Sequence, residues 1–437
     1  MNKPLTAVVL AGGIGTRFAP FSGNKLFMQF MGKPLIHYSL TQSLPDDVSR
    51  VVIIASPENY GDLGAPRLGV PSTVVVQDQP RGMADALITA GRELSGPVLV
   101  LIADHLVPKA VLSDVVSHAR KSKSFGVLPG WKRSEYFPGG YLKVSGNTVT
   151  GIVEKPVPGQ EPGDMVYISG TYIDDAAVLI NELSKTGPDG DDAYERTLTR
   201  MMGPLKFTVH RYEGPTATLK YPWHALDVFE YLAATSGTKG RGRNVVFKEN
   251  VIIEGDVRFG DNVRVYENTK ISGPCYIGSN TVIGNGNIIR HSHIGADCVT
   301  GFSTDITRSY IGDGCWFHTN YIGDSVLEGN VSMGSGAVLA NLRLDEGGVG
   351  SFVKEERIDT GRKKLGACIA RSVRIGVNAS IMPGVKIGRN SMIGAGLVIS
   401  EDIAADSYVS GTTVLSVRRN ERTVPQGDRG EFRDKLK

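Results

Sequence analysis

The residues best suited to chemistry lie in a glycine-rich segment, LAGGIGTRFAPFSGNKLFMQFMGKPL, which occupies positions 10–35. Gly12, Gly13 and Gly15 leave the main chain bare, so that its N–H groups can face phosphate oxygens. Arg17 can clamp the terminal phosphates of a polyphosphate, and Lys25 can neutralise phosphate charge during transfer. The residue order matches neither a P-loop nor a regular dinucleotide-binding fingerprint. The segment therefore predicts a phosphate-binding loop of another kind.

The elements around this loop alternate between two patterns from residue 7 to about residue 234. Short apolar, β-branched runs at 7–11, 51–55, 73–77 and 97–104 predict strands. Helices are expected at 34–43, 83–93 and 109–122. Continuous apolar strands separated by helices indicate an α/β domain whose mostly parallel sheet is covered on both faces. Asp104 ends the last of these strands, at the sheet edge where ligands gather.

A different periodicity governs the second half of the chain. Aliphatic residues recur every six positions in three runs: Ile271, Ile277, Ile283 and Ile289; Ile375, Ile381, Ile387, Ile393 and Ile399; and Val245, Val251, Val257 and Val263. Glycine often follows the aliphatic residue, where it would allow a tight corner. A six-residue period is the hexapeptide repeat of a β-helix. We expect three hexads to close each triangular coil, with the aliphatic side chains stacked inside.

These patterns predict two domains and a tail. We place an α/β domain at 1–235, a polar linker at 236–240, a β-helix at 241–416 and a charged tail at 417–437. The segment 346–364 contains no hexads, so it is expected to be a loop or hairpin that projects from an edge of the prism.

The composition limits the possible partners and compartments. The chain has 437 residues and a net charge of +3, so nothing points to nucleic acid or to a membrane surface. Its four cysteines, Cys275, Cys298, Cys315 and Cys368, form no C-x-x-C pair and are expected to be buried thiols. With no signal peptide or membrane-length apolar run in the sequence, we expect a cytoplasmic protein.

The first half resembles the sugar-1-phosphate nucleotidyltransferase family, whose signature is a G-x-G-T-R loop, a nearby lysine and G-K-P. Here these are residues 13–17, Lys25 and residues 32–34. The resemblance implies a Rossmann-like domain that joins a nucleoside triphosphate to a sugar-1-phosphate and releases pyrophosphate. It implies nucleotide contacts at Leu10, Ala11, Gly12, Gly13, Gly15, Thr16, Gln77, Gly82 and Met83, with Arg17, Lys25 and Asp104 as catalytic residues. It also implies Mg²⁺ at Asp104 and sugar contacts at Gly140, Glu154, Lys155 and Gly170.

The chain departs from that family at three positions. Met83 follows Gly82 where a threonine is usual, Thr218 stands where a second metal-binding aspartate is common, and Ile168 replaces the asparagine of the sugar strand. These departures leave the base and the sugar open. They also leave open a catalytically silent first domain.

The second half resembles the C-terminal domain of archaeal two-domain enzymes that transfer nucleotidyl groups and acetylate amino-sugar-1-phosphates. The residues that carry this resemblance are 318–345 and 360–367. It implies a left-handed β-helix, a homotrimer or hexamer, and acetyl-CoA bound between subunits. It assigns His318 as general base, with Tyr321 and Asn341 at the sugar or the thioester. Thr307, Gly347 and Gly350 stand where lysines are expected, and Ser332 replaces an amide.

Three functional hypotheses follow. The first is a nucleotidyltransferase, with or without acetyl transfer, and the second is an acyltransferase with a relic first domain. The third is a regulatory or assembly subunit that binds a nucleotide-sugar without turnover, in which the β-helix is a scaffold for trimerisation.

Overall fold

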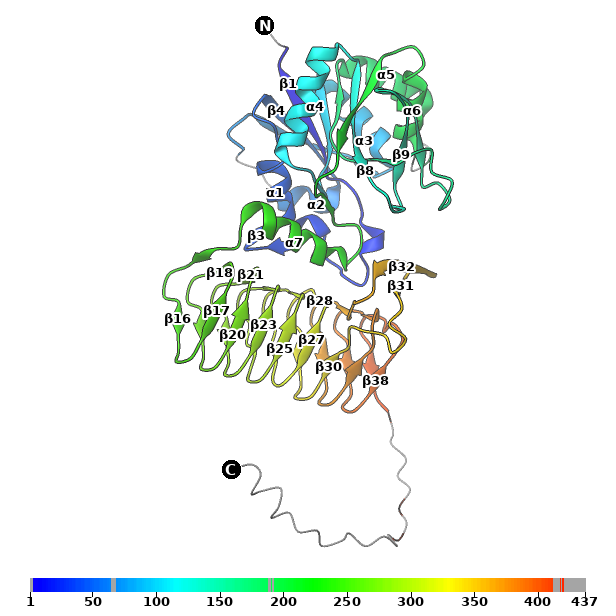
Figure 1. The fold of residues 1–437 in the computed structure, drawn as a ribbon. Coiled ribbons are helices and arrows are strands. Elements are labelled where there is room, and N and C mark those ends of the chain that lie inside the picture. Colours follow the sequence, from blue (N-terminus) through cyan, green and yellow to red (C-terminus); the bar gives the residue numbers. More distant parts are fainter. Residues whose placement is uncertain are drawn as a thin grey trace.

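The computed structural model describes residues 3–63, 68–187, 190, 192–411, 417 and 419, and places an α/β domain on one side of a triangular prism of coils (Figure 1). The tail predicted at 417–437 lies outside these residues except for two positions. Within the described ranges, no helix is both long and apolar enough to cross a membrane. The four cysteines are free and buried, as predicted.

The first part of the sheet in the N-terminal domain is parallel, with four strands in the order β5-β4-β1-β6. The strands are β1 (Leu5–Leu10), β4 (Val48–Ala55), β5 (Ser72–Val76) and β6 (Val98–Ile102). Each one coincides with a predicted apolar run to within a few residues. Val9 pairs with Ile53 on one side and with Leu101 on the other, so the centre of the sheet is fully apolar.

Beyond β6 the same sheet becomes mixed, which the sequence pattern did not reveal. The order continues β12-β8-β13-β10-β9-β11, and only the β13–β8 pairing is parallel. Its strands are β8 (Gly126–Lys132), β9 (Gly140–Ser145), β10 (Thr148–Glu154), β11 (Met165–Tyr167), β12 (Thr171–Ile173) and β13 (Phe207–Tyr212). A two-residue turn joins β9 to β10, so these neighbours must run antiparallel.

Helices cover both faces of the sheet, as predicted. One core contains α3 (Met83–Thr89), α5 (Ala176–Thr186) and α6 (Ala193–Met201), and the other contains α1 (Leu35–Thr41) and α4 (Lys109–Ser122). Helix α2 (Pro57–Leu63) follows β4. Pro108 is the N-cap of α4. The last helix, α7 (His224–Ser236), lies between the sheet domain and the prism (Figure 1).

Parallel strands form the three faces of the prism, and the third face consists of two sheets that isolated bridges at Val299 and Trp316 connect. The docking face, against the first domain, contains β15 (Gly240–Arg241), β18 (Val257–Phe259), β21 (Cys275–Ile277), β24 (His293–Ile294), β26 (Tyr310–Ile311), β28 (Val326–Leu327), β33 (Cys368–Ile369) and β36 (Lys386–Ile387). The second face contains β17 (Ile252–Glu254), β20 (Lys270–Ser272), β23 (Ile288–Arg290), β25 (Asp305–Thr307), β27 (Tyr321–Gly323), β30 (Val338–Leu339), β35 (Ser380–Ile381) and β38 (Val398–Ile399). The third face contains β16 (Val246–Phe247), β19 (Arg264–Val265), β22 (Val282–Ile283), β29 (Ser332–Met333), β34 (Arg374–Ile375), β37 (Met392–Ile393) and β39 (Tyr408–Val409).

The aliphatic residues of the hexads stack inside the prism, as the period predicted. Ile271 pairs with Ile289, and Ile289 with Ile306, so one coil takes about eighteen residues. Several corners between the faces are asparagines. Asn244, Asn262 and Asn280 have positive φ, which asparagine adopts more readily than most residues, and their side chains form a ladder of hydrogen bonds. Glycine follows the aliphatic residues for a second reason, which is the close approach of neighbouring coils. A Cβ on Gly278 would lie 2.4 Å from Ala296 N of the next coil. Left-handed winding of the whole prism stays a prediction.

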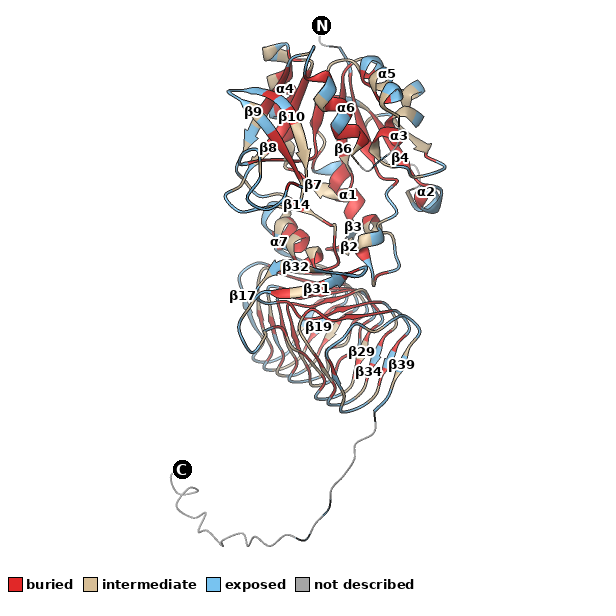
Figure 2. Ribbon diagram, turned by 90° about the vertical axis from the view of Figure 1, so that its right-hand side faces the viewer, coloured by how far each residue is buried: buried red, intermediate tan, exposed pale blue. Residues whose placement is uncertain are grey.

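The projecting segment is a hairpin of β31 (Val349–Val353) and β32 (Glu356–Arg362), within the predicted range 346–364. Figure 2 shows it beside α7, at the junction of the two domains. Val353 joins the interdomain core, and Arg362 forms an ion pair with Asp227 of α7. The hairpin therefore ties the prism to the first domain.

A continuous apolar core fills the domain junction. It combines Phe30, Tyr38 and Trp223 of the first domain with Tyr276 and Tyr310 of the docking face. His293 lies between the two tyrosine rings, at centroid distances of 4.9 and 4.6 Å. Its Nε2 accepts a hydrogen bond of 3.0 Å from Met31 N, while Nδ1 lies 3.2 Å from Ile311 O. Burial lowers the pKa of His293 to about 4, so the ring is neutral at pH 7.

Candidate active site

The glycine-rich loop leaves β1 and is held at its base by main-chain and side-chain hydrogen bonds. Ala11 N donates to Ile54 O over 2.8 Å, and Asn59 Nδ2 donates to Ala11 O over 2.7 Å. Gly15 has a φ of 69°, which favours glycine, and it leads into the short helix η1 (Thr16–Phe18) that carries Arg17. The fold thus presents the loop at the carboxyl edge of the parallel strands, where the sequence predicted it.

The two adjacent glycines of the loop differ in their surroundings. A Cβ on Gly12 would lie 3.3 Å from the Ala55 carbonyl carbon and 3.3 Å from Gln77 Oε1, so Gly12 packs against the sheet. A Cβ on Gly13 would meet nothing within 4 Å. Gly13 therefore borders open space in which its N–H can meet a ligand.

Lys25 and Asp104 face one another across the loop. Lys25 begins the short helix η2 (Lys25–Phe27), whose N-cap Asn24 accepts a hydrogen bond of 3.0 Å from Leu26 N. Asp104 follows β6, and Lys25 Nζ donates a hydrogen bond to its Oδ2. Their side chains are only 16% and 14% exposed, respectively. A cation and an anion, each suited to phosphate transfer, thus pair within the site.

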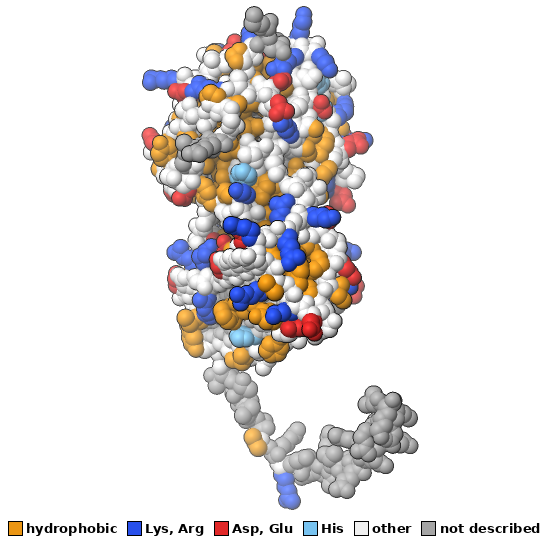
Figure 3. Space-filling view, turned by 90° about the vertical axis from the view of Figure 1, so that its left-hand side faces the viewer, with side chains coloured by type: hydrophobic (Ala, Val, Ile, Leu, Met, Phe, Trp, Pro, Cys, Tyr) orange, Lys and Arg blue, Asp and Glu red, His pale blue; other side chains and the backbone are white. Residues whose placement is uncertain are grey.

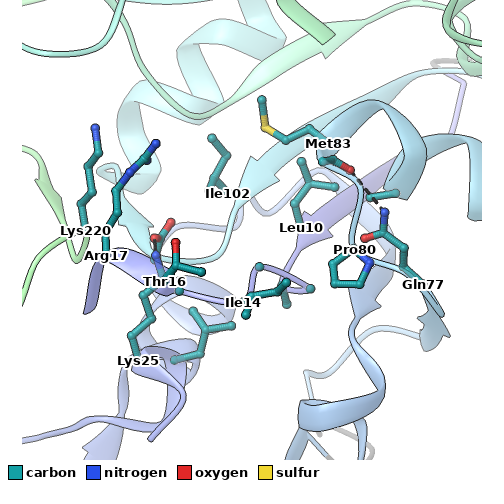
Figure 4. A pocket seen from close by; sticks show the side chains of 18 residues that line it. Leu10, Ile14, Thr16, Arg17, Lys25, Gln77, Pro80, Met83, Ile102 and Lys220 are labelled. Atoms are coloured by element: carbon teal, nitrogen blue, oxygen red, sulfur yellow. Dashed lines mark hydrogen bonds and ion pairs between the residues drawn. The ribbon is translucent and has the colours of Figure 1, made fainter. Parts of the chain in front are cut away.

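The expected base-binding residues form the other end of the site. Gln77 is buried, and its Nε2 donates to Asp85 Oδ2 over 2.6 Å and to Gly82 O over 3.3 Å. Gly82 has a φ of 105°, which favours glycine, and it is the N-cap of α3. Met83 begins α3 and points into the pocket (Figure 4). A thioether occupies the place where the family usually has a hydroxyl, so this wall is apolar.

These residues enclose one cavity of about 410 Å³. It is lined by Leu10, Ala11, Gly12, Gly13, Ile14, Gly15, Thr16, Arg17, Lys25, Leu26, Gln77, Pro80, Gly82, Met83, Ala86, Ile102, Asp104 and Lys220. Every nucleotide-contact residue expected from the sequence is in this set. Figure 4 shows Arg17 and Lys220 side by side at one end, with Pro80, Gln77 and Met83 at the other.

The four expected sugar residues lie outside the lining of this cavity. Gly140 pairs with Glu154 across β9 and β10, and a Cβ on Gly140 would lie 2.9 Å from Glu154 Oε2. Lys155 Nζ lies 3.3 Å from Glu154 Oε1. Gly170 is needed for packing, because a Cβ there would lie 2.2 Å from Leu112 Cδ2. Glu154 and Lys155 nonetheless act electrostatically on Lys220, so they are near the cavity.

Lys220 is the residue that sequence reasoning missed. It follows the short strand β14 (Ala217–Thr218), which pairs with β7 (His105–Leu106) directly after Asp104. Its Nζ donates to Pro138 O over 3.2 Å. Burial, together with the nearby positive charges of Arg17 and Lys155, lowers the pKa of Lys220 to about 8. No periodicity or motif marks this lysine, and the one available signal was its place beside Thr218.

A metal ion would find one carboxylate in the cavity lining. Among the described residues, no group of three or more histidine, cysteine, aspartate or glutamate side chains could hold a metal. Thr218, opposite His105 in the β14–β7 pair, supplies no carboxylate. Mg²⁺ is commonly bound by one or two carboxylates together with substrate phosphates. Asp104 therefore fits Mg²⁺ that arrives with a triphosphate.

In the prism, the structure brings together two of the three expected acyltransferase residues. A Cβ on Gly323 would lie 2.6 Å from Asn341 Nδ2 and 2.7 Å from Tyr321 Oη. Asn341 Nδ2 also donates to Asp324 Oδ2, which is paired with Arg308. His318 is exposed, and among the described residues its ring shows no contact with Tyr321 or Asn341.

Comparison with known proteins gives the family of each domain. Residues 6–211 match the nucleotidyl transferase family, and residues 369–401 match the bacterial transferase hexapeptide (six repeats). Most of the N-terminal domain is therefore similar to the nucleotidyl transferase family. The prism that follows this nucleotidyl transferase domain carries the hexapeptide repeats.

Relatives share both domains. The chain is 29% identical to a "Bifunctional sugar-1-phosphate nucleotidylyltransferase/acetyltransferase" of Sulfurisphaera tokodaii, over 92% of this chain and 99% of that protein. It is 26% identical to a "Bifunctional protein GlmU" of Methanocaldococcus jannaschii, over 95% and 100%. A solved UDP-glucose pyrophosphorylase from Acinetobacter baumannii covers 53% of this chain and 95% of its own, at 20% identity and a TM-score of 0.47. The matches to these two relatives thus extend over both the first domain and the prism of this chain.

Proposed function

We propose that the first domain is a sugar-1-phosphate nucleotidyltransferase, which converts a nucleoside triphosphate and a sugar-1-phosphate into a nucleotide-sugar and pyrophosphate. One observation carries the proposal: the bare glycine loop, Arg17, Lys25 and Asp104 line a single cavity. The printed name of the Sulfurisphaera relative, which the chain matches along nearly its whole length, supports the same activity.

The reaction is a single in-line displacement. An oxygen of the sugar phosphate attacks the α-phosphorus of the triphosphate, and the bond from that phosphorus to the oxygen bridging the α- and β-phosphates breaks. Pyrophosphate leaves with the electron pair of that bond. No covalent enzyme intermediate is required, so catalysis consists of positioning and of charge stabilisation.

Several of the lining residues have a defined task in that reaction. Main-chain N–H groups from Gly12 to Thr16 hold the phosphates, and Arg17 binds the β- and γ-oxygens. Lys25 leaves Asp104 to neutralise the transferred phosphate. Mg²⁺ held by Asp104 and phosphate oxygens would offset the charge that moves onto the leaving pyrophosphate. The apolar side chains of Leu10, Pro80 and Met83 offer a surface on which a base can lie.

A panel of triphosphates and sugar-1-phosphates tests the proposal by coupled detection of pyrophosphate. At least one pair should release pyrophosphate in a Mg²⁺-dependent manner. Arg17→Ala should lower kcat/KM about 100-fold or more, because an oxyanion-type contact is lost. Arg92→Ala, on the exposed surface, is the matched control. A blank panel with the folded wild-type protein would refute the proposal.

Acetyl transfer is a second candidate function, favoured by one local arrangement. Lys364 forms a β-bridge with Leu342, and Leu365 N donates to Asn341 O over 3.0 Å. The hairpin segment thus returns a lysine next to Asn341, although lysines are missing at Thr307, Gly347 and Gly350. Negatively charged CoA and amino-sugar phosphates require such a cation. The printed name of the Sulfurisphaera relative includes this activity as well.

Thiol release from acetyl-CoA tests this second candidate, with glucosamine-1-phosphate or galactosamine-1-phosphate as acceptor. Activity that His318→Ala abolishes would support His318 as general base. Activity that survives in His318→Ala would exclude that role. Binding of a nucleotide-sugar without any turnover in either assay would favour the regulatory subunit instead.

A homotrimer or hexamer built by the prisms, located in the cytoplasm, completes the proposal. The docking face is covered by the first domain, whereas the other two faces expose large apolar side chains. Figure 3 shows hydrophobic side chains gathered on the prism among lysines and arginines. The exposed apolar residues of the third face are Val246, Trp316, Met392 and Tyr408, and those of the second face include Ile252, Ile288 and Val398. Side-by-side contact between prisms would bury them.

A further inference from the structure

Lys220 brings into the cavity a positive charge that the mechanism above does not use. The main chain on both sides of this residue is held in place, since Leu219 N donates to Asp104 O over 2.9 Å and Lys220 N donates to His224 Nδ1 over 3.4 Å. Its neighbour Tyr221 is buried, and Lys220 Nζ lies 5.7 Å from the centre of that ring. The lysine side chain therefore leaves a fixed point next to Asp104.

The ammonium group lies between the two ends of the site. On one side it feels the charges of Arg17 and Lys25, which belong to the phosphate-binding loop. On the other side it feels Glu154 and Lys155, and it donates to the carbonyl of Pro138 in the loop before Gly140. Figure 4 shows its side chain running parallel to that of Arg17. This junction is where a sugar phosphate must meet a triphosphate.

The surroundings of Lys220 call for an anionic ligand. Across the part of the chain that the structure describes, no ion pair joins Lys220 to a carboxylate, and the hydrogen bond of its ammonium group goes to the carbonyl of Pro138. Arg17, Lys25 and Lys155 repel it. Placing several cations close together is unfavourable unless an anion joins them. A phosphate monoester, with two negative charges and three acceptor oxygens, satisfies this arrangement.

The threonine at position 218 also supports an anionic ligand at Lys220. Thr218 has a hydroxyl and supplies no carboxylate to a metal, and the cation Lys220 follows two residues later. The cavity lining consequently contains one carboxylate and three cationic side chains, Arg17, Lys25 and Lys220. A second carboxylate would bind a metal ion and so bring positive charge into the site. Here the side chain of Lys220 supplies positive charge instead.

We propose that Lys220 binds the phosphate of the sugar-1-phosphate and holds its attacking oxygen against the α-phosphorus of the triphosphate. This inference rests on the proposed nucleotidyltransferase function and names the residue that recognises its second substrate. Lys220 forms and breaks no covalent bond. It also makes the acceptor phosphate site depend on a side chain of this chain rather than on a second carboxylate-bound metal.

The first arm of the test measures binding without turnover. Glucose-1-phosphate and inorganic phosphate are titrated calorimetrically into wild type, Lys220→Met, Lys220→Arg and the exposed control Lys121→Met. Lys220→Met should weaken the binding of both probes about tenfold or more, and Lys220→Arg should recover most of it. Unchanged affinity in Lys220→Met, with an unaltered thermal midpoint, would overturn the inference. The binding arm gives an answer even if the pyrophosphate panel is blank, so the two proposals can fail separately.

The second arm uses a substrate pair that releases pyrophosphate. The KM for the sugar phosphate should rise about tenfold or more in Lys220→Met, while the KM for the triphosphate stays within about twofold. A merely structural role would raise both KM values together, and that outcome would contradict the assignment. Lys220→Gln, similar in size and uncharged, replaces the methionine variant if the latter does not fold.

Discussion

Lys25 and Asp104 form an ion pair across the phosphate-binding cavity, with Lys25 on the loop side and Asp104 at the end of β6. The pair is mostly buried, so little water weakens the attraction between its two charges. In the free protein, the groups that we assign to the phosphate and to Mg²⁺ therefore satisfy each other. Binding of a metal triphosphate has to exchange this contact for two new ones.

Removal of Lys25 should make Asp104 a better metal ligand in the free protein. In Lys25→Met we expect Mn²⁺ to bind about threefold to tenfold more tightly, because no ammonium competes for the carboxylate. Titration of free Mn²⁺ by electron paramagnetic resonance measures this directly. Lys33→Met, on the exposed β3 (Lys33–Pro34), should leave Mn²⁺ binding unchanged. Weaker binding in Lys25→Met would show that Asp104 does not act alone as the metal ligand.

The lowered pKa of Lys220 predicts an alkaline limit to the use of the sugar phosphate. The free protein loses this positive charge as the pH rises through about 8, whereas an ordinary lysine keeps it to about 10.4. Arg17, Lys25 and Lys155 disfavour the charge, and Glu154 favours it. The kcat/KM for the sugar phosphate, which reports on the free protein, should therefore fall above pH 8. In Lys220→Arg the decrease in kcat/KM should shift to higher pH. If the decrease does not shift, it belongs to another ionisable group.

The buried histidine of the domain junction predicts a loss of stability in acid. His293 has a pKa of about 4 when folded, below the unfolded value of about 6.5. Between these values the unfolded chain binds a proton that the folded chain refuses, so stability falls as the pH decreases from 6.5 to 4. His293→Phe should remove this contribution and should cost about 1–3 kcal/mol at pH 7, because Met31 N loses its acceptor.

Chemical denaturation across this pH range, together with amide hydrogen exchange at Met31, measures the effect. His318→Phe, on the exposed surface, should change stability by less than about 0.5 kcal/mol. If His293→Phe kept the wild-type acid dependence, other groups would be responsible for it.

A charge on the third face of the prism should break the proposed assembly. Trp316 is 52% exposed on this face, in the row that includes Met392 and Tyr408. Trp316→Glu should lower the mass from that of a trimer or hexamer to that of one chain, since burying an unpaired carboxylate between prisms is costly. Light scattering after size exclusion measures the mass. Lys239→Glu adds a negative charge in the exposed linker and should leave the assembly intact.

The parts of the fold that repeat or that touch phosphate could be predicted from the sequence. Ile271 and Ile289 stack because residues one coil apart share a position, and a linear period records this directly. The loop from Gly12 to Arg17 was equally accessible, since its function depends on bare main chain and on charges close in sequence. The predicted helix at 109–122 agrees with α4 in both bounds.

Contacts between distant segments could not be predicted in the same way. Lys220 enters the cavity because β14 pairs with β7, and two residues per strand leave no detectable pattern. The neutral state of the His293 ring depends on its contacts with Tyr276, Tyr310 and Met31, which belong to two domains. The antiparallel half of the first sheet depends on which strands meet, whereas an apolar run indicates only that a strand is buried.

The segment that follows Arg17 in the phosphate-binding loop is held partly by the prism. Between Arg17 and Lys25 the chain crosses to the prism, where Gly23 N donates to Glu328 Oε1 over 3.3 Å, and shortly after Lys25 the carbonyl of Gln29 accepts from Tyr310 Oη over 2.6 Å. The two halves are consequently not exchangeable modules. A truncated first half would bare Phe30 and Trp223 to water and release the segment that spaces its two cations, so transplanting this catalytic half onto another scaffold requires grafting the docking face with it.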